Sequence, residues 1–514
     1  MDPIMLAQTV ALIKGELNRP DSELLNLFKA FTQSSVATQG LQAYNLEAPA
    51  KNLFPYLVPL VDSIPRRVGG YGSQANWKAI TGVNIGSLSL GVAEGKRGGV
   101  VSTNMQEYYA AYRFLGFDDY VTEQAWRAAV NFQDLRATAR LNLLKAVRMW
   151  EDGLHLGGNG TAVALGTPTA PTVVDDASVG SLGNSTHYDV AVVALTLEGL
   201  MNIGGISALG AAVAATKILQ TIARGNAGPY GGTTTYYGGT SIPSAITDHQ
   251  TGGGGTAVHA FTPVVPGAVA YAWFIGTTGN ATLAAITTIN SVILSAVGAS
   301  TQTLASLAAT DYSKNALVYD GLLYQAWKPG SGSYIYNMPT GTPGVGTPLT
   351  ADGKGGIQEI TAVFRYLWDH YKIGVDQVWV SAQEAMNITQ KLLTGTGATA
   401  SQSFHFMVPA DQSGLVGGMV VDSILNPFDP RGPHRVKVRI EPNMAPGTML
   451  FEALEIPYPL SNVPVVRELE LRFDYIAVDW PKVQWADEFG VYFDGVLKHY
   501  FPPAMAIITN IANG

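Results

Sequence analysis

The 514-residue sequence contains no cysteine. This absence excludes a disulfide framework, a thiolate metal site and a cysteine nucleophile. It is also what we expect of a chain that folds in a reducing cytoplasm. The chain starts Met1-Asp2-Pro3, which is acidic where a secretory signal is basic, so we expect no signal peptide.

Charged residues are few, and their balance is slightly acidic. Lys and Arg number 31 against 39 Asp and Glu, which gives a net charge of −8. This balance excludes a general phosphate-neutralising nucleic-acid binder, so any contact with DNA must be weak. The most apolar run, residues 206–219, is rich in Gly and Ala and too short to cross a bilayer. We therefore do not expect a membrane protein.

Charge is scarcest between residues 157 and 310, where 7 of 154 residues are charged, against 63 of the other 360. Such a change over a long stretch predicts a separately folded insertion. Short strand candidates between turns favour an immunoglobulin- or fibronectin-like sandwich with Trp273 in its core. We expect a helix at 209–224 and a surface loop at 225–255. The candidate strands are 170–174, 188–196, 257–265, 268–276, 282–288 and 291–296.

One long amphipathic helix is predicted over residues 122–153, directly before this insertion. Thr122 supplies an oxygen-bearing cap, and Gly153 can end the helix in a left-handed conformation. At about 1.5 Å per residue the rod would be roughly 45 Å long, which implies that something extended lies along it. Its apolar stripe comprises Trp126, Ala129, Val130, Phe132, Leu135, Ala139, Leu143, Ala146, Val147 and Trp150, and its polar face comprises Arg127, Gln133, Arg136, Arg140, Asn142 and Lys145.

The segments before the long helix read as an arm and a hairpin. Two short amphipathic helices are expected within residues 1–31, followed by extended chain at 45–65. Strand-like arms at 74–81 and 100–115 flank a Gly- and Ser-rich middle. A lone two-stranded ribbon is marginal in water, so this one should lie on its own body or on a neighbouring subunit.

After the insertion the pattern is that of a mixed α+β body. Helices are predicted at 355–371 and from Ser381 to about residue 393, the second opened by a capping box of Ser381 and Glu384. A short buried strand at 378–380 lies between them. Four further strands are expected at 418–425, 435–441, 448–454 and 466–477, the last with alternating apolar and charged residues.

No chemical motif is found along the chain. There is no GxSxG elbow, Walker loop, dinucleotide fingerprint, EF-hand loop or HExxH pair. Asp118-Asp119 and Asp175-Asp176 are interpreted as a helix cap and a turn. The sequence thus predicts no catalytic, cofactor-binding or metal-binding residues. The histidines are interpreted as structural, namely His155, His187, His249, His259, His370, His405, His434 and His499.

The order of parts resembles the major capsid proteins of tailed bacteriophages with the Hong Kong 97 fold. The resemblance rests on that layout and on three stretches, Asn76-Trp-Lys-Ala-Ile-Thr81, Leu154-His-Leu-Gly-Gly-Asn159 and the segment from Glu488 to Pro503. It implies an α+β capsid fold with an all-β insertion on its outer surface. The implied parts are an N-terminal arm (1–65), an E-loop (66–117), a peripheral domain with a spine helix (118–156), the insertion (157–310), peripheral and axial helices (311–393), an axial domain (394–480) and a return to the peripheral domain (481–514).

The resemblance implies a non-enzymatic function, in which hexamers and pentamers form an icosahedral shell around double-stranded DNA. Neighbouring subunits would be held through the N-terminal arm and the E-loop, with a decoration or scaffolding protein and a portal as further partners. The virion capsid would be assembled in the host cytoplasm. One member of the family cross-links subunits through an E-loop lysine, for which Lys78 and Lys96 are the possible donors here.

Three other functions stay open from the sequence. An encapsulin-like cellular shell has the same fold around an enzyme cargo. A second alternative is a glycan-binding module carried on a structural scaffold, with the sandwich as its recognition domain. A third is a carbohydrate-active enzyme with a fibronectin-like insertion, for which the sequence offers no motif.

Overall fold

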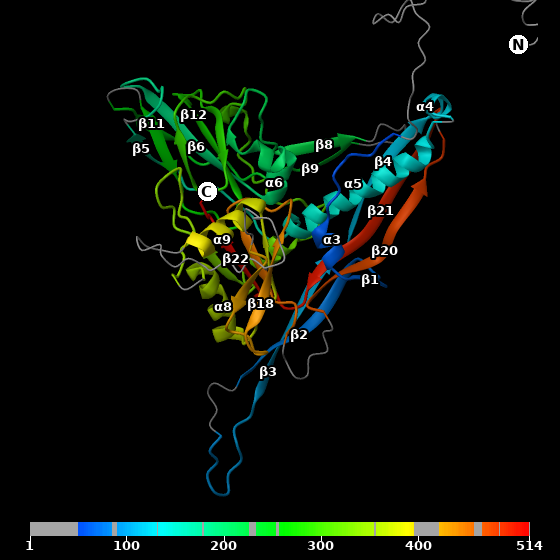
Figure 1. Cartoon of the computed structure of the whole chain (residues 1–514), viewed down its shortest axis with the longest axis vertical. Coiled ribbons are helices and arrows are strands. Elements are labelled where there is room, and N and C mark those ends of the chain that lie inside the picture. The colour runs from blue at the N-terminus through cyan, green and yellow to red at the C-terminus, as the bar shows by residue number, and fades with distance from the viewer. Residues whose placement is uncertain are drawn as a thin grey trace, which may run out of the picture. The chain divides into compact units, whose positions relative to one another are not determined.

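The computed structural model describes residues 50–84, 90–130, 132–176, 179–225, 233–252, 256–353, 356–394, 421–456, 465–482 and 484–512 (Figure 1). The helices predicted within residues 1–31 and His405 lie outside these ranges. The chain forms two units, one of residues 1–53 with 129–134 and one of residues 54–128 with 135–514. In the first, the N–H groups of Phe132 and Gln133 donate to the carbonyl of Ala129. All further description concerns the second.

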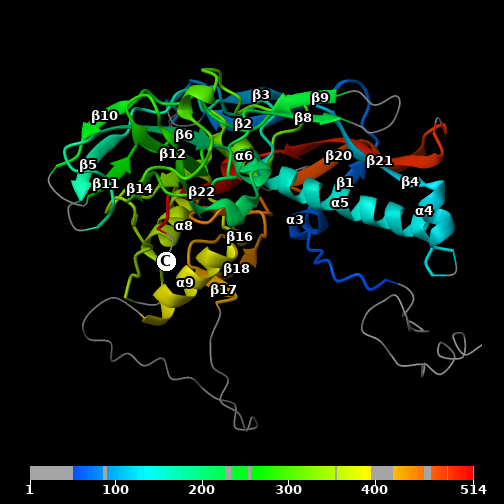
Figure 2. The ribbon, with the colours of Figure 1, turned by 90° about the horizontal axis from the view of Figure 1, so that it is seen from above.

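A four-stranded sheet with strand order β1-β20-β21-β4 carries the long helix α5 (Leu135–Gly157) along it, as Figures 1 and 2 both show. β20 (Arg467–Asp479) runs parallel to β1 (Arg66–Val68) and antiparallel to β21 (Ala486–His499), which also pairs with β4 (Arg113–Thr122). The strand predicted at 466–477 is thereby confirmed.

The charged face of β20 is less exposed than its alternation predicted. Glu468 and Glu470 are buried along with Leu469 and Leu471 on the opposite face. The ammonium of Lys498 lies 3.3 Å from the Glu468 carboxylate and also pairs with Glu470. Ion pairing therefore lets both faces of the strand be covered.

The single helix predicted over 122–153 is wrong, because the structure has two. α4 (Glu123–Ala128) is short, and α5 begins at Leu135 and continues past Gly153 to Gly157. Asp134 immediately precedes α5, a position at which Asp favours a new helix start over continuation. The 23 residues of α5 give a rod of roughly 35 Å, shorter than predicted.

Gly153 lies inside α5 and does not end it. Every residue from Glu151 to Gly157 is buried, whereas the earlier part of the helix buries only Leu143 and Val147. A Cβ at Gly157 would lie 2.7 Å from the Cβ of Leu197, so the glycine allows close approach of the chain that follows. Trp126 and Trp150, expected to be buried, are half-buried.

The predicted two-stranded arm is the hairpin of β2 (Gln74–Asn84) and β3 (Ser102–Ala111), with a register shift between Ile80 and Gly82. The second predicted strand extended to residue 115, but the chain after Ala111 enters β4 of the four-stranded sheet. The segment predicted as extended at 45–65 contains a short helix, α3 (Pro59–Ser63), whose Leu60 and Val61 are buried. Pro59 at its first position suits a helix start.

Residues 170–294 form two facing sheets close to the six predicted strands. One has the order β10-β6-β12-β13-β7 and the other β14-β11-β5. Their inner faces share one core, in which Trp273 is fully buried. The strands are β5 (Thr172–Asp176), β6 (His187–Leu195), β7 (Gly210–Ala211), β10 (Thr247–Gln250), β11 (Ala257–Phe261), β12 (Ala270–Thr277), β13 (Thr282–Thr287) and β14 (Ser291–Leu294).

The larger sheet of the sandwich is also part of the main hydrophobic core. The second face of this sheet, including Val193, Phe274 and Ile286, joins the main core with α7 (Leu322–Trp327). The hydroxyl of Tyr324 donates to the carbonyl of Gly267 at 2.9 Å. The low charge of this stretch therefore reflects a sheet covered on both sides.

The helix predicted at 209–224 is also wrong. That stretch contains β7 and the start of the hairpin of β8 (Thr221–Gly225) and β9 (Thr233–Tyr237), which falls partly in the predicted surface loop. The only α-helix described between β6 and β7 is α6 (Leu197–Asn202), followed by a 3-10 turn at Gly205–Ala208. Gly210, at the start of the predicted range, has a φ of 99°, which a helix does not accommodate.

A six-stranded mixed sheet, β15-β22-β19-β16-β18-β17, has its own core with α8 (Gln358–Tyr371) and α9 (Ala382–Thr394). Both helices were predicted, and the Ser381 hydroxyl accepts from the Glu384 N–H as a capping box requires. Its strands are β15 (Tyr334–Asn337), β16 (Gln377–Val380), β17 (Ser423–Asn426), β18 (His434–Ile440), β19 (Met449–Glu452) and β22 (Met505–Thr509), and 3-10 turns lie at Leu304–Ser306 and Pro502–Ala504.

The two sheets take their last strands from alternating parts of the chain. β20 already belongs to the four-stranded sheet, and β22 returns to the six-stranded one. The chain thus crosses between the two sheets near Val466 and again near Phe501.

Candidate assembly surfaces

The β2–β3 hairpin is held at its base and exposed along most of its length. The indole of Trp77 stacks on Tyr108 at 5.9 Å and meets Tyr500 edge-on at 6.0 Å. Farther out, Ile80 and Met105 are 68% and 69% exposed, and Tyr109, beside the base, is 71% exposed. Lys78 lies opposite Glu107 in the ladder and Lys96 in the exposed connection. The hairpin therefore presents apolar side chains that the described part of its own chain leaves uncovered.

A second junction ties the segment before the hairpin to the buried end of α5. The Asp152 carboxylate accepts hydrogen bonds from the N–H groups of Leu60 and Val61 at 2.9 and 3.0 Å, which caps α3. Its other oxygen accepts from the Asn443 amide at 3.2 Å. Burial and Asp152 together raise the pKa of the neighbouring Glu441 carboxyl. One carboxylate thus joins α3, α5 and the segment after β18.

Next to it, Glu151 is the centre of a buried polar network. The Arg66 guanidinium lies 2.5 Å from the Glu151 carboxylate, and the Tyr475 hydroxyl also donates to that carboxylate. Burial opposes its charge, but His155, Arg66 and Tyr475 outweigh burial, so the pKa of Glu151 falls to about 2. His155 in turn contacts the Tyr319 hydroxyl at 3.0 Å. Breaking such a buried network strongly destabilises a fold.

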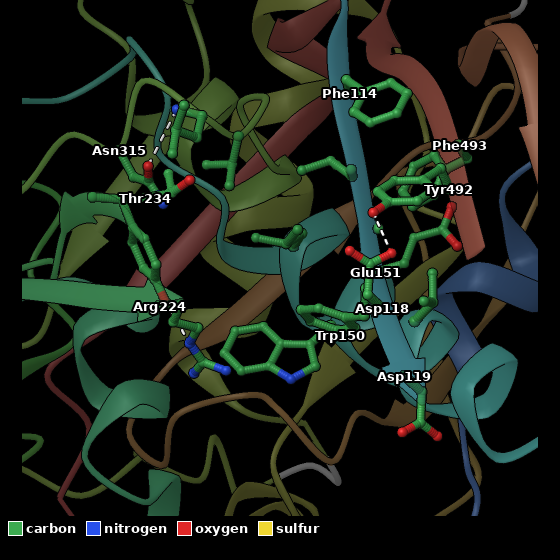
Figure 3. A pocket seen from close by; sticks show the side chains of 18 of the residues that line it. Phe114, Asp118, Asp119, Trp150, Glu151, Arg224, Thr234, Asn315, Tyr492 and Phe493 are labelled. Carbon is green, nitrogen blue, oxygen red and sulfur yellow. Dashed lines mark hydrogen bonds between the residues drawn. The ribbon is translucent and has the colours of Figure 1, made fainter. Parts of the chain in front are cut away.

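An aromatic cleft of about 750 Å³ lies between β4, the buried end of α5 and the β8–β9 hairpin (Figure 3). Phe114 stacks on Tyr492 at 4.9 Å, and the Arg224 guanidinium lies 5.4 Å from the Trp150 ring. Its lining residues are mostly aromatic or acidic: Phe114, Phe117, Asp118, Asp119, Tyr120, Trp150, Glu151, Glu198, Arg224, Tyr236, Trp480, Glu488, Tyr492 and Phe493, among others.

Two carboxyl groups in this cleft are bound by other residues. Asp118 accepts from the Trp480 indole N–H at 3.1 Å and from the Tyr492 hydroxyl. Glu198 accepts from the Asn315 amide at 2.6 Å, and burial raises its pKa to about 7 despite that bond. Asp118-Asp119, interpreted from the sequence as a helix cap, lie instead within β4.

The histidines lie far apart, and in the sandwich they pair with aspartates. His249 contacts Asp175 at 2.8 Å and His259 contacts Asp176 at 2.9 Å. Asp175-Asp176 were predicted as a turn, but they lie in strand β5. His187 pairs with Asp248 at 2.9 Å. His370 contacts the Tyr366 carbonyl and His434 lies 3.4 Å from Asp376. His499 is buried, and burial lowers its pKa to about 3.

The described residues contain neither a metal-binding cluster nor a membrane-spanning helix. They contain no group of three or more His, Asp or Glu side chains that could hold a metal ion. Among the helices of these same ranges, none is both long and apolar enough to span a membrane. The aromatic cleft could not be found from sequence, because its lining comes from stretches that lie far apart in the chain. Its only local signal is the run of aromatics in Phe114, Phe117 and Tyr120.

Neither protein-family models nor curated protein sequences match this chain. Solved structures with a similar course of chain are found. The capsid of Myoviridae phage XM1 has 8% identity and a TM-score of 0.39, over 91% of this chain and 97% of that one. The capsid of the native GTA particle has 8% identity and a TM-score of 0.41, over 93% and 99%.

The capsid structure of the cyanophage P-SCSP1u is similar at 8% identity and a TM-score of 0.38, over 94% of this chain and 100% of that chain.

Proposed function

We propose that this chain is a major capsid protein that assembles into an icosahedral shell around the double-stranded DNA of a tailed bacteriophage. Hexamers and pentamers are its building units. The four-stranded sheet with α5 is the peripheral domain, the six-stranded sheet with α8 and α9 is the axial domain, and the β2–β3 hairpin is the E-loop. This arrangement is the Hong Kong 97-type capsid fold.

The observation that carries this proposal is the uncovered hairpin. Strands of 11 and 10 residues project from a base at Trp77 and Tyr500, and their apolar side chains remain exposed. A free two-stranded ribbon is marginal in water, and exposed apolar clusters mark protein interfaces. A neighbouring subunit is the surface that completes it. The arm before Arg66 reaches another neighbour from its anchor at Asp152.

The sandwich at residues 157–310 is an immunoglobulin-like addition on the outer surface of the shell. Two antiparallel sheets around a core tryptophan support that assignment. A decoration protein on this surface, a scaffolding protein and a portal are further partners. The net charge of −8 favours weak, non-specific contact with packaged DNA.

Electron microscopy of the expressed chain tests the proposal. Closed shells are expected from the parent chain. Deletion of residues 85–99 should leave soluble capsomers or misassembled protein, whereas exchanging Val174, an exposed residue of β5, for Ser should leave shells intact. Normal shells from the deletion would remove the hairpin from the proposal.

The contents of purified shells separate two members of this fold class. Mass and nucleic-acid measurements on shells from infected or producing cells should find DNA. A protein cargo without DNA would identify an encapsulin-like cellular shell instead.

A further inference from the structure

A row of basic side chains lies on one face of the six-stranded sheet. Arg435, Lys437 and Arg439 occupy alternate positions of β18, so they project from the same face at intervals of about 6.6 to 6.8 Å. All three are exposed. Val436, which lies between the first two, is buried in the core that the sheet shares with α8 and α9. The three cations, called the basic stripe below, therefore face away from both helices.

The register of the sheet shows how far this face is covered. Arg439 lies opposite Trp379 of β16, and its guanidinium is 5.6 Å from the indole ring. Trp379 and its neighbour on β19, Leu450, are fully buried in the main core. On β17, by contrast, Leu425 lies opposite Arg435 and is 62% exposed. The basic stripe therefore lies on an uncovered border of the sheet, formed by β17 and β18 (Figure 2).

Neighbouring carboxylates do not neutralise the basic stripe. Within the described ranges none of its three side chains forms an ion pair, whereas Arg431, just before β18, pairs with Asp376 and Asp429. Glu441, directly after β18, is buried. Asp422 stands two residues before a side chain of the α8–α9 core, so strand alternation places it on the opposite face. The border is thus a positive surface on a chain whose net charge is −8.

The arrangement of the three cations suits a linear polyanion. A compact anion is bound by donors that converge on one point, whereas these three project side by side from an extended strand. Guanidinium groups bind phosphate oxygens through paired N–H donors, and an ammonium group adds a point charge. Charges that only protect a sheet edge are expected on the edge strand itself, but β17, Ser423-Ile-Leu-Asn426, carries none. A nucleic-acid backbone therefore fits the basic stripe best.

The sandwich contacts the other border of this sheet. The N–H of Asn290 donates to Asn510, which follows β22, at 2.8 Å. The hydroxyl of Ser291 accepts from the N–H of Gly344, which follows β15, at 2.9 Å. β15 and β17 are the two ends of the strand order, so the basic stripe and the sandwich lie at opposite borders.

We propose that the basic stripe faces the interior of the shell and binds the phosphate backbone of the packaged double-stranded DNA. The contact is independent of base sequence, because it neutralises phosphates and reads no base edges. This inference rests on the proposed function, in which the sandwich lies on the outer surface, and it assigns the contact with DNA to three residues.

Salt-dependent DNA binding by disassembled subunits tests this assignment. The test variant replaces all three cations by glutamine and should melt as the parent does, because the positions are exposed: Arg435→Gln, Lys437→Gln and Arg439→Gln. Its affinity for a short DNA duplex of mixed sequence is measured as salt rises from about 50 to about 200 mM. The slope of log K against log salt concentration should be smaller in magnitude by about 3 than that of the parent.

A matched control removes the same charge from exposed lysines in three separate segments and should keep the slope of the parent: Lys217→Gln, Lys328→Gln and Lys372→Gln. Equal slopes for the test variant and this control would overturn the proposal and leave the assembly function standing. A test variant that binds DNA as the parent does, yet closes few shells, would also overturn it and assign the basic stripe to a contact between subunits. A parent chain that forms no shells would instead defeat the assembly function.

Discussion

Two antiparallel strand pairs of similar length differ sharply in what covers them. In β6 and β12 all residues except His187 and Thr277 at their ends are buried. In β2 and β3 most residues are exposed. The first pair is apolar at successive positions, as in Val190-Ala-Val-Val-Ala-Leu195. The second mixes apolar and polar residues on both faces.

The difference indicates which contacts are made within one chain. A pair that is apolar on both faces needs two covering layers, and here the smaller sheet of the sandwich and the main core supply them. A pair with apolar residues exposed on a projecting ribbon lacks such layers. In the proposed function, its partner is another copy of the chain.

The largest expected effect is on the doubly covered pair. Replacing residues 160–308 by a short Gly/Ser linker should give insoluble protein, because it uncovers Leu322, Leu323 and Tyr324, which are fully buried. Soluble yield and a thermal melt measure this. Exchanging residues 90–99 of the hairpin for Gly and Ser at equal length is the control, and its subunit should melt as the parent does. A folded deletion variant would show that the sandwich is separable after all.

Single aromatic truncations sharpen the same contrast. Phe274→Ala in β12 should lower the free energy of unfolding by about 3 to 5 kcal/mol, since the side chain is fully buried. Tyr109→Ala in β3 should leave the melt of disassembled subunits unchanged and reduce the number of closed shells. Equal melting changes in the two variants would break the comparison.

Glu198 gives a pH-dependent effect of intermediate size. Its pKa is raised from 4.5 to about 7 by burial, so the folded state binds the extra proton and stability is lost as pH rises from 4.5 through 7. Glu198→Gln keeps an oxygen for Asn315 and removes the charge. Melts should be equal at pH 4 and favour the variant at pH 8, by on the order of 3 kcal/mol. A variant advantage that is the same at both pH values would contradict this assignment.

The smallest effects are expected along the exposed part of α5. Arg140→Ala loses an exposed ion pair with Asp479 at 2.5 Å and should cost less than about 1 kcal/mol. Trp150→Ala removes a half-buried ring that contacts Phe117 and Arg224, and should cost about 1 to 2 kcal/mol. Thermal melts of disassembled capsomers rank the two. The reverse order would show that the polar face supports folding.

Periodicity identified most regular elements because their patterns are local. α8, α9 and six of the eight sandwich strands were predicted within a few residues. Two helix predictions, 122–153 and 209–224, were wrong because residues in or beside them favour a helix end or a new start. Asp134 precedes a new helix start, and Gly210, with a positive φ, stands at the start of the Ala-rich run.

Packing between distant segments could not be predicted from the sequence. Nothing local marks Asp152 as the cap of a helix 92 residues earlier in the chain. The low charge of residues 157–310 predicted a separate domain but gave no sign that its larger sheet is buried on two sides. The cleft was missed for the same reason, since one wall holds Phe114 and another holds Arg224.

The strand order has a consequence for synthesis of the chain on the ribosome. β21 lies between β20 and β4, and β22 lies between β15 and β19, so the last strands made occupy interior places in both sheets. Neither sheet closes until residues 486–509 have emerged. Nascent chains therefore lack both finished sheets, and in the proposed function incomplete polypeptides are expected to stay out of the growing particle.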